Sequence, residues 1–194
     1  DLNALVESSA VLSAPNGTIN VSASAGSQSK TIENINSDTE SVNDEAKDKI
    51  SDTTTSTIRL IGITAGGGFV GVGVTIAVLL VFTEVHAIMA GNVQNAKNVS
   101  VHAGIDYGQV LTGTLAITGG AVAVSVSGAV TYFQANVVSA IGGSANLTGV
   151  TSTISVTTTG NTNAIAAAAS AGGGAVAVNA GMALTINRTR VDTF

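Results

Sequence analysis

The sequence predicts an all-β chain in which strands stack in a repeated array, interrupted once by a helical segment. Apolar residues alternate with small or polar ones over long stretches, which is the period-2 pattern of a strand with one face buried. The glycine-rich stretch 63–85 recurs in two later copies, at 116–137 and 169–191. The composition is 45% apolar and 10% charged with 23 glycines, which fits tightly stacked β coils whose narrow interior is filled by small residues.

Residues 1–32 form the first predicted β unit. Within it, Pro15, Asn16 and Gly17 are typical of a turn between two short strands. Residues 18–24 then alternate, which places one apolar set on a common face: Ile19, Val21 and Ala23.

Residues 33–57 depart from this pattern and predict a helical insertion, with the helix itself near 38–51. Ser37 and Glu40 have the spacing of a capping box. A narrow apolar stripe follows at four-residue spacing: Val42, Ala46 and Ile50. Residues 33–52 hold seven acidic and two basic side chains, so this segment accounts for the whole net charge of −5.

The charged side chains of this insertion are a candidate partner contact. They are Asp38, Glu40, Asp44, Glu45, Lys47, Asp48 and Lys49. The alternative interpretation is a solvated surface helix that packs on the scaffold through its apolar stripe, since charge runs usually face water. The rest of the chain is neutral and has no basic patch, so we expect no nucleic-acid partner.

Residues 58–194 contain the repeats, which align on three glycine pairs. These are Gly67 and Gly68, Gly119 and Gly120, and Gly173 and Gly174, at spacings of 52 and 54 residues. After each pair the same apolar positions recur: Val70, Val122 and Val176; Val72, Val124 and Val178; Val74, Val126 and Ala180. A second matching strand contains Ile19, Val99 and Ile154. The unit of about 53 residues is long enough for two solenoid coils, and each unit is expected to cover its neighbour's apolar face.

The 24 uncharged residues 60–83 are long enough for a membrane-spanning helix. Five glycines in that stretch oppose a helix, because each costs about 1 kcal/mol in a helix interior, and the aligned copies contain polar residues. We therefore predict a strand and no membrane insertion. This copy is the most apolar of the three, so it is either covered, which we expect the helical insertion to do through its stripe, or it leaves an apolar surface exposed.

No catalytic, cofactor-binding or metal-binding residue is predicted, and we expect no enzyme. The chain has two histidines, His86 and His102, and no cysteine; Glu84 beside His86 is a possible metal pair, but a polar strand end explains it more simply. A polysaccharide-active enzyme would need clustered acids. Outside the insertion the acids are Asp1, Glu7, Glu84, Asp106 and Asp192.

The recurring pieces GITAGGGFVGVGVTIAV, GGAVAVSVSGAV and GGGAVAVNAGMALTINRT resemble the repeats of very large bacterial exoproteins. These include filamentous-haemagglutinin-like proteins, autotransporter adhesins and high-molecular-weight leukotoxins. The resemblance implies a right-handed parallel β-helix, secretion or display on the bacterial outer surface, and a role in adhesion or host-cell toxicity. It carries over no functional residue.

We accordingly expect a passenger segment cut from a longer protein that binds a host-cell surface protein or glycan. The alternative is a structural stalk segment with no binding of its own. Open ends of a β stack would also favour end-to-end self-association of the segment.

Overall fold

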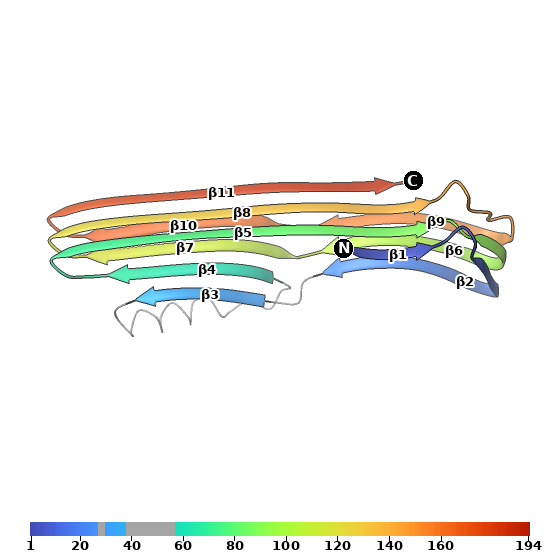
Figure 1. Ribbon diagram of the computed structural model, residues 1–194, viewed down its shortest axis with the longest axis horizontal. Coiled ribbons are helices and arrows are strands. Elements are labelled where there is room, and N and C mark those ends of the chain that lie inside the picture. The colour runs from blue at the N-terminus through green and yellow to red at the C-terminus, as the bar shows by residue number, and fades with distance from the viewer. Residues whose placement is uncertain (27–29, 38–56) are drawn as a thin grey trace.

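The computed structural model describes residues 1–26, 30–37 and 57–194 and consists there of eleven strands without a helix (Figure 1). The strands are β1 (Leu2–Val6), β2 (Val11–Gly26), β3 (Lys30–Ser37), β4 (Thr57–Gly66), β5 (Val70–Met89), β6 (Asn92–Asp106), β7 (Gln109–Gly119), β8 (Val122–Ile141), β9 (Val150–Asn161), β10 (Ala164–Gly173) and β11 (Val176–Thr193). The predicted all-β class and the strand interpretation of the apolar stretch are confirmed.

The strands form three sheets in which all pairing is parallel. Sheet A has the order β1-β5-β8-β11, sheet B the order β2-β6-β9, and sheet C the order β10-β7-β4-β3. In Figure 1 the long strands of sheet A run the length of the molecule, whereas sheets B and C each take one half of that length. The chain visits A, B and C in turn before it returns to A, which is a parallel β-helix-like arrangement.

The register confirms the repeat alignment row by row. Val70 pairs with Val122, which pairs with Val176 on its other side. In sheet B, Val99 lies between Ile19 and Ile154. The repeat, however, is one circuit through the three sheets and not the two coils that we predicted. Coil lengths of twenty to thirty residues do not apply, because the sheet A strand alone takes 20 residues in β5 and β8.

The first circuit is irregular in sheet C, where β3 pairs directly with β4 and Lys30 lies beside Ile58. The predicted start of the insertion is therefore wrong: residues 33–37 are strand, and β4 begins at Thr57. The predicted helix lies outside the described residues. So do the proposed contact residues Asp38, Glu40, Asp44, Glu45, Lys47, Asp48 and Lys49.

The predicted turn at Pro15 to Gly17 is a bulge inside one strand. The pairing of β2 with β6 shifts between Ala14 and Thr18 and then continues. Asn16 takes a positive φ of 61°, a conformation that asparagine tolerates better than most residues. Beyond the bulge, Val21 and Ala23 are buried, as their alternation predicts.

The repeated glycine pairs form the corner at which sheet C passes into sheet A. Gly68 and Gly120 have φ values of 129° and 147°, which side chains rarely adopt. A Cβ on Gly120 would lie 2.3 Å from the Gly68 carbonyl oxygen, and one on Gly174 would lie 2.1 Å from that of Gly120. The corners therefore stack backbone against backbone, which excludes a side chain.

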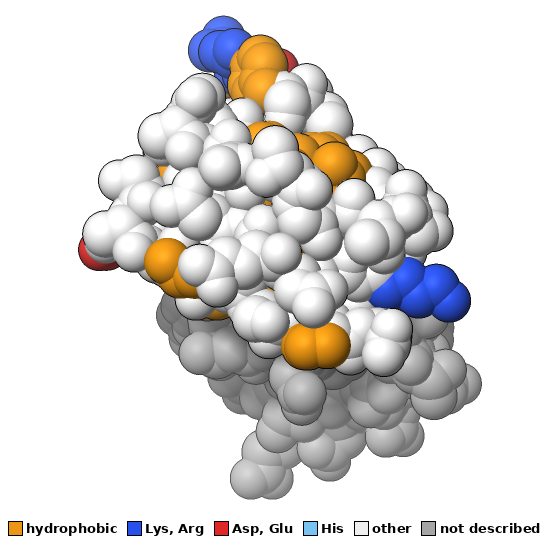
Figure 2. All heavy atoms as spheres, turned by 90° about the vertical axis from the view of Figure 1, so that its right-hand side faces the viewer, with side chains coloured by type: hydrophobic (Ala, Val, Ile, Leu, Met, Phe, Trp, Pro, Cys, Tyr) orange, Lys and Arg blue, Asp and Glu red, His pale blue; other side chains and the backbone are white. Residues whose placement is uncertain are grey.

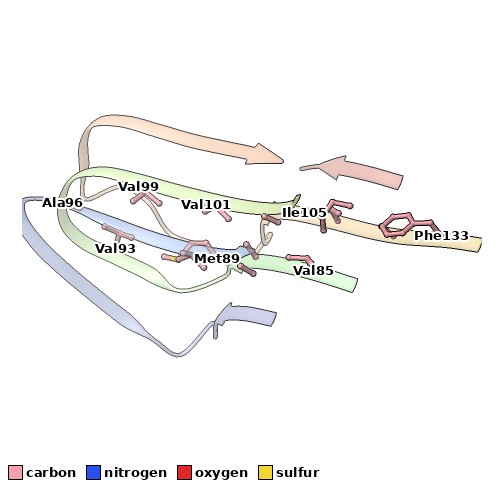
Figure 3. Packing of buried hydrophobic residues seen from close by; sticks show 14 of the residues in the cluster. Val85, Met89, Val93, Ala96, Val99, Val101, Ile105 and Phe133 are labelled. Carbon is pink, nitrogen blue, oxygen red and sulfur yellow. The ribbon is translucent and has the colours of Figure 1, made fainter. Parts of the chain in front are cut away.

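Between sheets A and B the interior is a conventional hydrophobic core (Figure 3). Its labelled members are Val85, Met89, Val93, Ala96, Val99, Val101, Ile105 and Phe133. Phe133 has no exposed surface and meets the Tyr107 ring edge-on at a centroid distance of 5.4 Å.

Between sheets A and C the interior is filled by small and hydroxylated side chains. Its inward residues from sheet A are Gly71, Gly73, Thr75, Ala77, Ala123, Ser125, Ser127, Ala129 and Thr131. A Cβ on Gly73 would lie 2.7 Å from Thr118 Cγ2, and the Thr131 hydroxyl donates to Thr112 Oγ1 at 2.7 Å. In this half, the inward residues of sheet A named above are therefore no larger than threonine.

The expectation that the apolar alternate set is buried is therefore wrong in this half. The outward side chains are the valines, and the inward ones are the glycines, alanines, serines and threonines that accompany them. Val72 is 61% exposed while its inward neighbours Gly71 and Gly73 are buried. The spacing between the sheets, and not hydropathy, selects the inner set.

Candidate interaction surface

The outer surface of sheet A carries a continuous apolar face. The pairing of β5, β8 and β11 places one residue of each strand side by side, and we call each such set of three a row. The face consists of the six outward rows from that of Val70 to that of Leu80. The apolar face comprises Val70, Val72, Val74, Ile76, Val78 and Leu80, with Val122, Val124, Val126, Val130 and Tyr132, and Val176, Val178, Ala180, Met182, Leu184 and Ile186. The β5 members are 50–72% exposed.

No charged residue occurs on the apolar face. Three strands about 4.8 Å apart, with rows about 7 Å apart, give it a flat area of roughly 500 Å². The largest apolar patch on a typical monomer is about 300–600 Å² and is often functional. The apolar stripe that was expected to cover this face, Val42, Ala46 and Ile50, lies outside the described residues. In the described part of the chain the apolar face is exposed.

The same outer surface becomes polar at the next two rows. One row is Phe82, Gln134 and Arg188, and the other is Glu84, Asn136 and Arg190. All of these side chains except Phe82 line a shallow groove of about 370 Å³. The guanidinium of Arg190 pairs with Asp192 on the same strand. Among the described residues, no basic group pairs with Glu84, so an acidic side chain on β5 faces water across from the arginines of β11.

An aromatic pair forms the boundary between the apolar face and the polar rows. The rings of Phe82 and Tyr132 are 5.5 Å apart and tilted by 42°. The Tyr132 hydroxyl donates to Gln134 Oε1 at 2.7 Å. Phe82 itself is 65% exposed, so this boundary offers ring surface and hydrogen-bonding groups side by side.

The side chains that could have carried metal or acid–base chemistry have structural partners or stand apart. His102 Nδ1 lies 3.0 Å from Thr157 Oγ1. Asp106 accepts from the Asn161 side chain at 3.0 Å and from the Gly108 amide at 3.3 Å, which fixes the turn between β6 and β7. His86 lies on the outer side of sheet A, and the described part of the chain contains no cluster of three or more His, Cys, Asp or Glu side chains that could hold a metal.

The side of the molecule at which the long strands of sheet A end has a different surface from the apolar face. Figure 2 shows this side, where the hydrophobic side chains are scattered and few charged side chains appear. Over the described ranges, no helix is long and apolar enough to cross a membrane. The outer surface of sheet A differs from this side because it carries a continuous apolar face.

No protein-family model, curated protein or solved structure matches this chain. Its surfaces are accordingly interpreted from their own chemistry.

Sequence reasoning located the strands of this surface but assigned it to the interior. A usable signal was present in the inner set, because glycine inside a strand marks a close approach of another backbone. Gly71 and Gly73 alternate with Val70, Val72 and Val74, so the glycine positions, and not the valines, indicated the side that meets sheet C.

Proposed function

We propose that the chain is a segment of a right-handed parallel β-helix from a large secreted or surface-displayed bacterial protein of the adhesin or leukotoxin type. Parallel pairing of strands whose paired residues are 52 to 55 positions apart in the sequence supports this proposal. Each circuit contacts its neighbours in the stack, as in other repeat proteins. Such a stack makes a long stiff body that presents its outer faces along its whole length.

The proposed activity is binding to a host-cell surface protein or glycan. The polar rows beside the apolar face support it, since they combine an exposed aromatic ring, amides, two guanidinium groups and a carboxylate. Recognition sites typically combine apolar surface with a few placed polar groups. The charged residues of the insertion stay a second candidate contact.

Binding of the labelled chain to cultured host cells tests this activity. Replacing Arg188 and Gln134 by alanine removes polar groups that are exposed on the surface, so folding is expected to persist. Cell binding should fall at least tenfold, whereas replacing Ile154 on β9 by threonine should leave it unchanged. Unchanged binding of the first variant would exclude the polar rows as the contact.

A parallel set of variants addresses the insertion. Converting its acids to their amides, beginning with Asp38→Asn, Glu40→Gln and Asp44→Asn, removes charge with little change in shape. Loss of cell binding in this set alone would assign the contact to the insertion.

The stalk is the second candidate function, and the regular stack supports it equally. A stalk needs stiffness and no ligand, so no surface substitution should matter. Absence of saturable binding to any host-cell type would favour the stalk over the adhesin. The enzyme alternative has no supporting arrangement among the described acids, since Glu84 and Asp106 belong to different sheets.

A further inference from the structure

We propose that the apolar face of sheet A packs against the same face of a second copy of this chain, forming a two-fold symmetric dimer. The dimer would bury the polar rows proposed above as the host-cell contact, so the dimer and that contact are alternative uses of the same rows, whereas a stalk is compatible with the dimer. The proposal rests on three properties of the outer surface of sheet A: its area, its lack of charge over the apolar rows, and the distribution of charge on the rows beyond them.

The area suits such an interface. From the row of Val70 to the row of Glu84 the outer surface is about 50 Å long and about 14 Å wide, given the rise per residue and the strand spacing. Two copies would therefore bury roughly 1,400 Å² together, which is within the standard range for specific protein interfaces. Stacked sheets bury apolar side chains in this manner at a separation of about 10 Å.

The charges are self-complementary under one choice of axis. A two-fold axis that runs along β8 sets β5 of one copy opposite β11 of the other and keeps every row opposite the same row. Apolar rows then meet apolar rows. Glu84 of each copy lies opposite Arg190 of the other, whose guanidinium also pairs with Asp192 of its own chain.

The same axis explains why β8 carries no charge on this surface. Residues of β8 lie on the axis and face their own equivalents, so a charge there would meet a like charge. The outward residues of β8 are Val122, Val124, Val126, Gly128, Val130, Tyr132, Gln134 and Asn136. All of them are uncharged, while β5 and β11 carry Glu84, Arg188 and Arg190.

Sedimentation velocity over a concentration series tests the proposal on the whole chain. We expect a reversible transition from 19.0 kDa to twice that mass, with a dissociation constant on the order of micromolar, as for interfaces of this size without optimised contacts. Val126→Lys sets two lysines opposite each other across the axis and should weaken the dimer at least tenfold. The matched control Ile154→Lys changes a side chain of similar exposure, 46% against 38%, on sheet B and should leave it unchanged.

Charge exchange tests the axis itself. Glu84→Arg and Arg190→Glu should each weaken the dimer, and the double variant E84R/R190E should recover affinity to within about threefold, since pairs in contact are coupled. A monomer throughout the series, a dimer insensitive to Val126→Lys, open-ended oligomers, or a double variant weaker than either single variant would overturn the proposal.

Discussion

Phe133 and Phe82 provide a matched test of which side of sheet A is buried. Both are phenylalanines on long strands of sheet A, and both contact a tyrosine ring, at 5.4 and 5.5 Å. Phe133 has no exposed surface, while Phe82 is 65% exposed. Replacing either by alanine removes the same atoms, so the difference between the two variants reports burial alone.

Phe133→Ala should lower the free energy of unfolding by about 3–5 kcal/mol, the usual cost of deleting a buried phenylalanine. The lost edge-on contact with Tyr107 is included in that figure at about 0.5–1.5 kcal/mol. Phe82 has only about a third of its surface buried, so Phe82→Ala should cost about 1 kcal/mol. The expected difference is therefore about 2–4 kcal/mol.

Urea denaturation of both variants, each made in the Val126→Lys background and measured at about 1 μM protein to suppress dimer formation, measures this difference. Equal costs would refute the assignment of Phe133 to the interior and Phe82 to the outer surface. A larger cost for Phe82→Ala would show that the outer surface is the buried one.

Four further substitutions test the interior between sheets A and C and the glycine corner beside it by the same denaturation assay. Ala123→Val, at a residue with no exposed surface, should destabilise by about 1–3 kcal/mol through overpacking, and a stabilised variant would contradict the narrow interior. Thr112→Val removes one of the two hydrogen-bond partners of the buried Thr131 hydroxyl, the other being the Ile165 carbonyl oxygen, and should cost about 1 kcal/mol. Thr114→Val, whose hydroxyl is buried without a described partner, should be neutral or stabilising, and equal losses would reject the pairing. Gly120→Ala should cost about 1–3 kcal/mol, because the residue has a positive φ and the added Cβ meets a carbonyl oxygen, and an unchanged unfolding midpoint would reject the stacked corner.

The sequence was sufficient to predict the all-β class and the register of the repeated strands. Register was predictable because identical positions recur at a nearly constant step, so Val70, Val122 and Val176 had to occupy equivalent places. The corner glycines followed from the same alignment. These features depend on repetition, which a single chain displays without any homologue.

The sequence did not predict which alternate set faces inward. Period-2 alternation divides a strand into two sets, and the usual hydrophobic criterion assigns the valines to the interior. That criterion fails between sheets A and C, where the backbones approach so closely at Gly71 that even a Cβ would meet the Gly119 carbonyl oxygen and the inward residues named above are no larger than threonine. Hydropathy contains no information on this separation. Between sheets A and B the separation is larger, and the inward set of the same strands includes Val85, Met89 and Phe133, as the criterion expects.

The sequence also did not predict the number of circuits in each repeat. Alternation continues through residues 70–89 without a turn signal, but typical coil lengths favoured two short coils in each unit. The strand of 20 residues is possible because two successive shorter strands, such as β6 and β7, share the opposite side of the stack (Figure 1).

Thiol accessibility tests the inside-out alternation most directly. The chain has no cysteine, so Val72→Cys and Ala123→Cys each introduce a single reporter. Val72 is 61% exposed and Ala123 is fully buried. In the folded monomer we expect a maleimide to label the cysteine at position 72 at the rate of a free thiol, and the one at position 123 at least 100-fold more slowly. Slow labelling at position 72 together with fast labelling at position 123 would contradict the account.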